Sequence, residues 1–446
     1  SEPGVRAASK KAIRLAKKHG AKVVMDVDYR PVLWGLTTPE LGEQRFVANE
    51  AVTGELQTII ADCDLIVGTE EELHILGGTT NTLEAIRKVR ELSEAVIVCK
   101  RGELGCTVYE GEIGNSLDDG IFGESFRIEV FNVLGAGDAF MAGFLRGWLR
   151  GRPLSECCTW ANACGALVVS RHGCAPSIPS WDELQYFLEN GSDYLALRHD
   201  TRLEHVHWAT NRKNDYPDLK ILAIDHRVQF EQLADSLSVD RGKISRLKEL
   251  ASQALHDVAR GDPGFGILLD GQYGDDALAA MGDYPYWIGR PIEASGELPL
   301  NFVGGDAVAT EINTWPLTQT VKCLVNYRMS DPVDRRERQE RQLLRLFDAC
   351  RKTRHELLIE IITSENGSRD PGAITSTIER LYDIGIYPDW WKLEAAGTDA
   401  EFEQISTVIN ENDPWCRGIV LLGLAAPMDE LLASFRMAAT HGLVKG

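Results

Sequence analysis

Short apolar runs alternate with amphipathic helical stretches along the first 185 residues of the chain. Strand-like runs occupy residues 21–28, 65–68 and 95–99. Apolar residues recur with helical periodicity in residues 5–19, 49–61 and 82–92. Because strands that alternate with helices form βαβ units, this pattern predicts an α/β unit with a largely parallel sheet.

A polar stretch rich in turn-forming residues, 189–218, follows and predicts a linker after a first domain over 1–188. The alternation then resumes over 219–446. The strand-like runs of this part are residues 220–225, 265–270, 286–293, 321–328, 355–363, 388–395 and 417–424. Helical stretches separate most of these seven runs, and residues 443–446 resemble the start of an eighth. The count predicts an incomplete (β/α)8 barrel whose eighth strand is truncated.

The charge and the cysteines restrict the class of protein. A net charge of −20 argues against nucleic acid and anionic membranes as partners, because both would be repelled. No apolar run is long enough to span a bilayer. The ten cysteines contain no C-x-x-C pair, which favours a reduced cytoplasmic protein over a disulfide scaffold. We expect a cytoplasmic homo-oligomer that acts on small molecules.

The segment Gly135-Ala136-Gly137-Asp138 is a loop that runs into a helix. Glycines allow a close approach of backbone N–H groups, and a helix N-terminus adds partial positive charge, so the turn is suited to bind an anion. An Asp at such a turn is suited to accept a proton from a hydroxyl that attacks a phosphate. The alternative is that Asp138 only caps the helix.

Together with its flanks, this segment resembles the D-T-x-G-A-G-D-x-F-x-x-G signature of the ribokinase-like (PfkB) sugar kinases, and the resemblance extends over residues 5–185. It implies a kinase that uses ATP and Mg²⁺, with Asp138 as the base and Gly135, Ala136 and Gly137 as the anion hole. It also implies a magnesium role for Glu72. The remaining residues implied to lie at the nucleotide are Lys100, Gly102 and Gly105 in one turn, and Asn162 on a helix.

Two residues depart from the family pattern. Asn132 stands where the family usually has Asp, and Thr69 stands where it usually has Asn. The sugar-contacting Gly-Gly motif and the lid strands of the family would precede residue 1. The motifs therefore do not reveal the sugar, and we expect a fragment that binds nucleotide without phosphorylating a substrate.

In the predicted barrel, polar residues collect at the C-terminal ends of strands, where catalytic groups lie in such folds. Lys392 and Glu394 share one face of the sixth strand-like run, and Glu360 lies on the fifth. A lysine in a partly dry barrel would have a lowered pKa and can attack a carbonyl as a free amine. The alternative is a Lys–Glu pair that serves only packing or solubility.

The order of these residues resembles that of the tagatose-bisphosphate-type class I aldolases over roughly 219–446. The segments that carry the resemblance are residues 222–227, 268–274, 321–324, 359–360 and 391–394. The resemblance implies Lys392 as a Schiff-base lysine that needs no cofactor, and Glu360 as acid/base. It also implies Asp225 and Lys322 as polar partners. His226 replaces a more usual Gln.

The two resemblances together imply a kinase that takes a sugar acid and ATP, joined to an aldolase that cleaves the phosphorylated product. The alternatives are a different sugar substrate and a barrel that is a non-catalytic sensor or assembly module. The phosphate site of such barrels is built by the loops after strands seven and eight, here near residues 423–426. A barrel that stops at residue 446 would expose a strand edge, so we expect poor stability in isolation.

Overall fold

The computed structural model describes residues 3–38, 46–365, 368–370, 372–423 and 426–446. The chain divides into two compact units, Ser1–His207 and Trp208–Gly446. The range expected to be a linker contains the helix α8 (Thr201–Thr210), within which this division falls. Of the predicted phosphate site near 423–426, residues 424 and 425 lie outside the described residues.

The first unit is built on a five-stranded sheet with the order β1-β2-β3-β4-β5. Its strands are β1 (Val24–Asp26), β2 (Leu65–Thr69), β3 (Val96–Lys100), β4 (Cys106–Tyr109) and β5 (Ile121–Gly123). The first three strands are parallel, as predicted. The other two continue the sheet in antiparallel pairing and were not anticipated.

Helices cover both faces of this sheet. They are α1 (Pro3–Lys18), α2 (Glu50–Ile60), α3 (Glu70–Gly77), α4 (Thr82–Leu92), α5 (Ala136–Trp148), α6 (Leu154–Val169) and α7 (Trp181–Asn190). Helices α2, α3 and α4 pack on one face, where Ile66 and Ile97 are buried. Helices α5 and α6 pack on the other face, where Val67 and Val98 are buried. Alternation of side chains along each strand supplies both cores.

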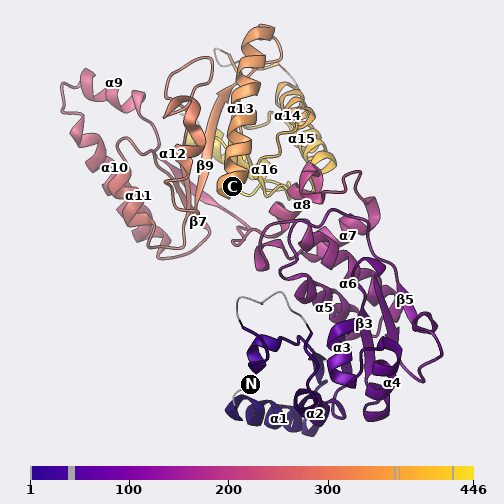
Figure 1. The fold of residues 1–446 in the computed structure, drawn as a ribbon. Helices are drawn as coiled ribbons and strands as arrows, with labels where there is room; N and C mark the ends of the chain where they lie inside the picture. Colours follow the sequence, from indigo (N-terminus) through magenta and orange to yellow (C-terminus); the bar gives the residue numbers. More distant parts are fainter. Residues whose placement is uncertain (1–2, 39–45, 366–367, 371, 424–425) are drawn as a thin grey trace. The chain divides into compact units, whose positions relative to one another are not determined.

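The second unit is a seven-stranded, all-parallel sheet with the strands in chain order. Its strands are β6 (Lys220–Ala223), β7 (Phe265–Leu268), β8 (Trp287–Pro291), β9 (Gln319–Asn326), β10 (Leu357–Ile362), β11 (Trp390–Leu393) and β12 (Gly418–Leu421). Six of these strands lie within their predicted runs, and β9 begins two residues before its predicted run 321–328. Helices lie around the outside of this sheet (Figure 1). They are α9 (Val228–Ser236), α10 (Gly242–Ala259), α11 (Asp275–Met281), α12 (Val308–Ile312), α13 (Val333–Thr353), α14 (Ala373–Asp383), α15 (Asp399–Asn412) and α16 (Met428–Ala438).

The sheet is curled, because side chains from strands far apart in its order meet in one cluster. Leu219, Trp287 and Trp390 belong to this cluster, although they lie at β6, β8 and β11. The last residues of the chain lie between the two ends of the sheet. Lys445 N donates to Ile419 O on β12 (2.7 Å), and Leu219 N, just before β6, donates to Lys445 O (2.6 Å). The open edge expected at the eighth position is thus bridged at these residues, although β6 itself remains mostly exposed.

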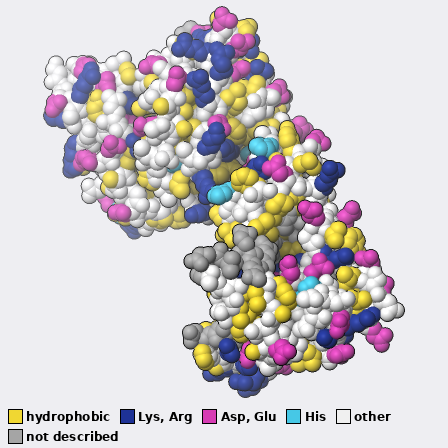
Figure 2. Space-filling view, viewed as in Figure 1, with side chains coloured by type: hydrophobic (Ala, Val, Ile, Leu, Met, Phe, Trp, Pro, Cys, Tyr) yellow, Lys and Arg dark blue, Asp and Glu magenta, His cyan; other side chains and the backbone are white. Residues whose placement is uncertain are grey.

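Acidic and basic side chains are interspersed over the visible face of the second unit (Figure 2). Within the described residues, no helix combines the length and the apolar character that a membrane span requires. All ten cysteines are free thiols.

Candidate functional site

The predicted anion turn lies at the start of α5. Gly135 occupies the N-cap position with φ +85°, a left-handed conformation that favours glycine. A β-carbon on Gly135 would lie 2.5 Å from Cys174 Sγ, so the turn also has no room for a side chain there. No side chain caps this helix among the described residues. The first N–H groups of α5 therefore remain suited to an anionic ligand.

Lys100 brings positive charge to the same turn. A β-carbon added to Gly137 would lie 3.7 Å from Lys100 Nζ, at van der Waals distance. The ammonium also pairs with Asp26 Oδ1 (3.3 Å) and Glu72 Oε2 (3.7 Å). Burial raises the pKa of Asp26 above its usual value, against the opposing effect of Lys100. The structure thus joins Gly137, Lys100 and Glu72 in one place.

Asp138 follows in the first turn of α5, with an exposed side chain. Its Oδ2 atom lies 3.9 Å from Cys174 Sγ. No described cation forms an ion pair with this carboxylate. The carboxylate is therefore accessible to a substrate hydroxyl.

The remaining residues predicted to lie at the nucleotide shape or hold the local backbone. Gly102 begins a 3-10 turn and Gly105 caps its end, with φ +58° and +85°. A β-carbon on Gly105 would overlap Gly123 O at 2.1 Å. Asn162 Nδ2, on α6, donates to Gly123 O (3.0 Å) and Glu124 O (2.9 Å). These contacts fix the end of β5 and the residue after it, and they use the Asn162 amide that the family resemblance assigned to the nucleotide.

The candidate magnesium residue is held by its own helix. Glu72 Oε2 accepts from Thr69 N (2.7 Å), while Thr69 Oγ1 accepts from Glu72 N (3.3 Å), which is a capping box. The described residues contain no cluster of three potential metal ligands. Glu72 and Asp26 are two carboxylates side by side. That set fits a Mg²⁺ ion held mainly by phosphates and water, as this ion prefers.

The second unit contains a buried network centred on Lys322. Its Nζ atom contacts Asp225 Oδ2 (3.2 Å), Glu293 Oε1 (3.1 Å) and Glu360 Oε2 (2.8 Å). Asp225 lies just after β6, Lys322 on β9 and Glu360 on β10. Only 3% of the Lys322 side chain is exposed. Such a charge is tolerated inside a protein only when it is fully paired.

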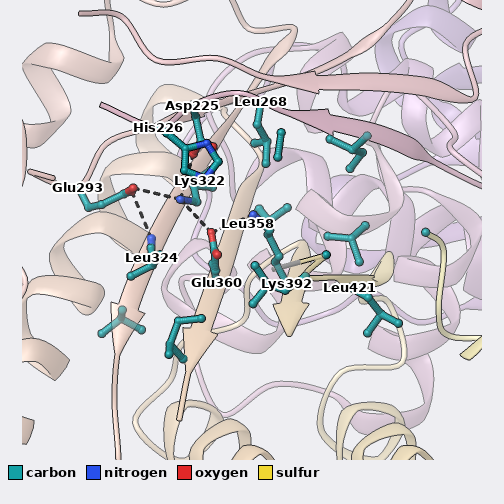
Figure 3. A pocket seen from close by; sticks show the side chains of 18 of the residues that line it. Asp225, His226, Leu268, Glu293, Lys322, Leu324, Leu358, Glu360, Lys392 and Leu421 are labelled. Atoms are coloured by element: carbon teal, nitrogen blue, oxygen red, sulfur yellow. Dashed lines mark hydrogen bonds and ion pairs between the residues drawn. The ribbon is translucent and has the colours of Figure 1, made fainter. Parts of the chain in front are cut away.

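Lys392 joins the network through the same carboxylate. In the pairing of β10 with β11, Glu360 stands opposite Lys392, so the two side chains share a layer of the sheet interior. Lys392 Nζ lies 3.1 Å from Glu360 Oε2. The structure therefore brings together all four predicted barrel residues, as Figure 3 shows.

Sequence reasoning did not assign roles to two members of the network, Glu293 and Arg227. Arg227 Nη2 lies 3.0 Å from Glu293 Oε1, and Glu293 Oε2 accepts from Leu324 N (3.2 Å). Glu293 is the last residue of the predicted run 286–293, and Arg227 follows the run 220–225, so their positions at strand ends were the available signal. With them, three cations face three carboxylates: Lys322, Lys392 and Arg227 against Asp225, Glu293 and Glu360.

The network shifts the pKa values of two of its members, Asp225 and Lys322. Burial alone would raise the pKa of Asp225, but Lys322 and Lys392 outweigh it and hold that pKa well below its usual range. Burial alone would lower the pKa of Lys322, but Glu293, Glu360 and Asp225 outweigh it and raise that pKa well above its usual value. Both groups are therefore charged at neutral pH.

Two other polar residues at strand ends hold backbone. Glu394 Oε2 accepts from Thr363 N (2.9 Å), Thr363 Oγ1 (2.9 Å) and Ser364 N (3.1 Å), which fixes the end of β10. Asp270 Oδ1 accepts from Gln272 N (2.9 Å) and Tyr273 N (2.8 Å) after β7. Unlike these residues, Lys392 forms its hydrogen bond with a side chain, that of Glu360.

The network lines a cavity of 1540 Å³ inside the curled sheet. Asp225, Glu293, Lys322, Glu360 and Lys392 form part of its wall. Four leucines labelled in Figure 3 also line it: Leu268, Leu324, Leu358 and Leu421. The cavity is large enough for a sugar phosphate, since small-molecule sites commonly measure about 300–1,000 Å³.

Comparison with known families assigns both units. The model of a family described as an uncharacterized protein conserved in bacteria, DUF2090, matches residues 183–446, more than half of the chain. The chain belongs to the DUF2090 family. The model of the pfkB family carbohydrate kinases matches residues 37–181, so a pfkB domain precedes the DUF2090 region. This confirms the predicted ribokinase-like α/β domain.

Several curated relatives of the first unit share a name. The chain is 30% identical over 188 residues to the 5-dehydro-2-deoxygluconokinase of Halalkalibacterium halodurans, which covers 41% of this chain and 51% of the relative. It is 26% identical over 188 residues to the enzyme of that name from Bacillus subtilis, with 41% and 52% covered. The chain thus spans about half the length of the curated relatives it matches.

Among solved structures, the aminoimidazole riboside kinase of Salmonella enterica is 25% identical, with a TM-score of 0.33 over 40% of this chain and 56% of that one.

Proposed function

We propose that the protein is an ATP-dependent kinase that phosphorylates the 6-hydroxyl of 5-dehydro-2-deoxy-D-gluconate, joined to a Schiff-base aldolase that cleaves the product. The observation that carries this proposal is the buried Lys392–Glu360–Lys322 arrangement in a region that follows a pfkB domain in the sequence. The relatives named 5-dehydro-2-deoxygluconokinase support the choice of sugar acid. The order of the two domains also resembles the long form of that kinase, from bacterial myo-inositol breakdown.

In the kinase half, Asp138 accepts the proton of the 6-hydroxyl as this oxygen attacks the γ-phosphate of ATP. The N–H groups at Gly135–Gly137 and the Lys100 ammonium bind the negative charge of the phosphates. Glu72, with Asp26 beside it, would hold Mg²⁺. When bound, that ion neutralises charge on the phosphates. Asn162, Gly102 and Gly105 shape the nucleotide side of the domain.

In the second half, Lys392 gives a proton to Glu360, and the resulting free amine attacks the C5 carbonyl of the 6-phosphorylated sugar acid. The carbonyl oxygen leaves as water with a proton from Glu360, and an iminium ion forms. The C3–C4 bond then breaks, the C3 hydroxyl loses its proton to a carboxylate, and the bonding pair passes to the iminium. Malonate semialdehyde leaves. The remaining enamine takes up a proton and is hydrolysed to dihydroxyacetone phosphate and free Lys392.

The arrangement supports these steps electrostatically. Lys392 bears a positive charge both as an ammonium and as an iminium, and Glu360 faces it at 3.1 Å in the resting state. Lys322 stays charged because three carboxylates surround it. It therefore competes with Lys392 for Glu360 and provides a fixed positive charge beside the substrate oxygens.

One observation favours a second function for the barrel. Its three cations and three carboxylates compensate each other, so the network is also consistent with a stable, non-catalytic core. In that case the barrel is a sensor or assembly module for a kinase that acts on another sugar.

Product analysis of the natural full-length protein separates these functions. With ATP, Mg²⁺ and 5-dehydro-2-deoxygluconate, we expect ADP, dihydroxyacetone phosphate and malonate semialdehyde. Accumulation of the 6-phosphate without cleavage would support the non-catalytic barrel. Turnover of other sugars from a panel, but not of this sugar acid, would contradict the proposed substrate.

A further inference from the structure

A second buried lysine, Lys248, lies outside the network that the proposed function uses. It projects from α10, and its side chain is 0% exposed. The buried stripe of α10 consists of Ile244, Lys248, Ser252, Leu255 and Ala259, which share one helical face. A lysine in such a stripe costs free energy unless its charge and its donors are satisfied.

The Lys248 ammonium is fully satisfied. It donates to Ile224 O (2.8 Å) and His226 O (2.8 Å), and it pairs with Asp270 Oδ2. An ammonium has three N–H donors, and these three acceptors use all of them. Lys248 is therefore unsuited to be a nucleophile or a proton donor, and its role must come from what it holds.

The two carbonyls that Lys248 binds flank Asp225 in the chain. Strand β6 pairs with β7 only as far as Ala223 in the ladder, with one further bond from Ile224 N to Leu268 O (3.0 Å). Beyond that point the backbone is held by the hydrogen bonds from Lys248 and no longer by the pairing of β6 with β7. The Asp225 side chain, between the two anchored carbonyls, reaches Lys322 Nζ at 3.2 Å.

We propose that Lys248 is a positioning residue that fixes the end of β6 and thereby holds the Asp225 carboxylate on Lys322. Asp270 belongs to the same device, because it binds Lys248 with one oxygen and the turn after β7 with the other. One helical side chain thus ties the ends of two neighbouring strands together. Arg227, which holds Glu293, follows directly in the same anchored segment.

The effect on catalysis rests on the proposed aldolase function, whereas the effect on Asp225 does not. The test variant is the double change K248M/D270N, which removes the pair without leaving an unpaired buried charge. Exposed Lys243, on the same helix, gives the control K243M. Circular dichroism of the full chain verifies that each variant is folded.

The first readout is the ¹³C resonance of the Asp225 carboxyl during a pH titration, assigned with Asp225→Asn. The charged groups that act on this carboxyl are Lys322, Lys392 and His226, together with Lys248 itself. In the folded double variant we expect the titration to move up toward the ordinary value of about 3.9, because the carboxylate leaves Lys322. An unchanged Asp225 titration in that variant would overturn the proposal.

The second readout is the rate of borohydride trapping with dihydroxyacetone phosphate as the probe. A misplaced polar group can reduce a rate on the order of 100-fold, and we expect a loss of that size in the double variant but not in K243M. Wild-type trapping in a folded double variant would also overturn the positioning role. Absence of trapping in the wild-type protein would instead contradict the aldolase proposal, and the Asp225 titration would still decide the role of Lys248.

Discussion

Lys322 and Lys392 contact the same oxygen of one buried carboxylate. Glu360 Oε2 lies 2.8 Å from Lys322 Nζ and 3.1 Å from Lys392 Nζ. Two ammonium groups repel each other in a medium of low dielectric constant, and the shared carboxylate, with Asp225 and Glu293 around Lys322, offsets this repulsion. A change of charge at Lys392 therefore alters the electrostatic environment of Lys322, because both contact Glu360.

Removing the shared carboxylate should destabilise the DUF2090 region. Breaking a buried ion pair by removing one partner costs about 3–5 kcal/mol, and we expect E360Q to lower the free energy of unfolding by that amount. Urea unfolding of the full chain measures it. Glu365 pairs with Arg328 at the surface, where such pairs contribute about 0–1 kcal/mol, so E365Q is the matched control. Equal stability of the two variants would contradict the buried network.

Asp225 should make stability depend on pH at the acidic end. Its pKa is lowered in the folded state, so it stabilises the fold above its unfolded pKa of about 3.9. This contribution is lost as the pH falls through the still lower folded value. We expect the wild-type protein to lose stability below about pH 4 more steeply than D225N. Parallel acid-unfolding curves would show that Asp225 is not paired.

Lys322 should have the opposite dependence at the alkaline end. Its pKa is raised in the folded state, so its stabilisation is present below the unfolded pKa of about 10.4 and is lost as the pH rises through the folded value. Unfolding of wild-type and K322M protein, followed by fluorescence above pH 10, tests this. The stability difference between the two proteins should shrink only there.

Asp138 should be required for phosphorylation but not for folding. Its side chain is exposed, and surface changes usually alter stability by less than about 0.5 kcal/mol. We expect D138N to retain the wild-type melting midpoint and to lose kinase turnover by about 10²–10⁴-fold. Exposed Asp193 provides the control D193N. Retained turnover in D138N would refute the assignment of Asp138 as the base.

Much of this architecture follows from local sequence pattern. The seven strand runs of the second unit and the order of β1, β2 and β3 were predictable from the apolar runs, because the fold buries these apolar residues. Strands β4 and β5 were missed because they have only 4 and 3 residues, and because β5 is partly exposed. The bridge from Lys445 to Leu219 was also not predictable, since it depends on the curvature of the whole sheet.

The candidate sites were predictable where a residue type is unusual for its place. Lys392 in an apolar strand and Asp138 at a glycine turn are such residues. Glu293 and Arg227 were not assigned, because a charged residue at a strand end is ordinary and only the three-dimensional pairing shows its partner. Lys248 could have been noticed, since it interrupts the apolar stripe of α10. Its acceptors, however, are carbonyls of another element, which sequence does not reveal.

The most direct test of the account is reduction of the full-length protein with borohydride in the presence of dihydroxyacetone phosphate, followed by peptide mass spectrometry. The account predicts a covalent adduct on the peptide that contains Lys392, absent in K392M and unchanged when exposed Lys352 is replaced by Met. An adduct on another lysine, or none in folded wild-type protein, would contradict the assignment of Lys392 as the Schiff-base residue.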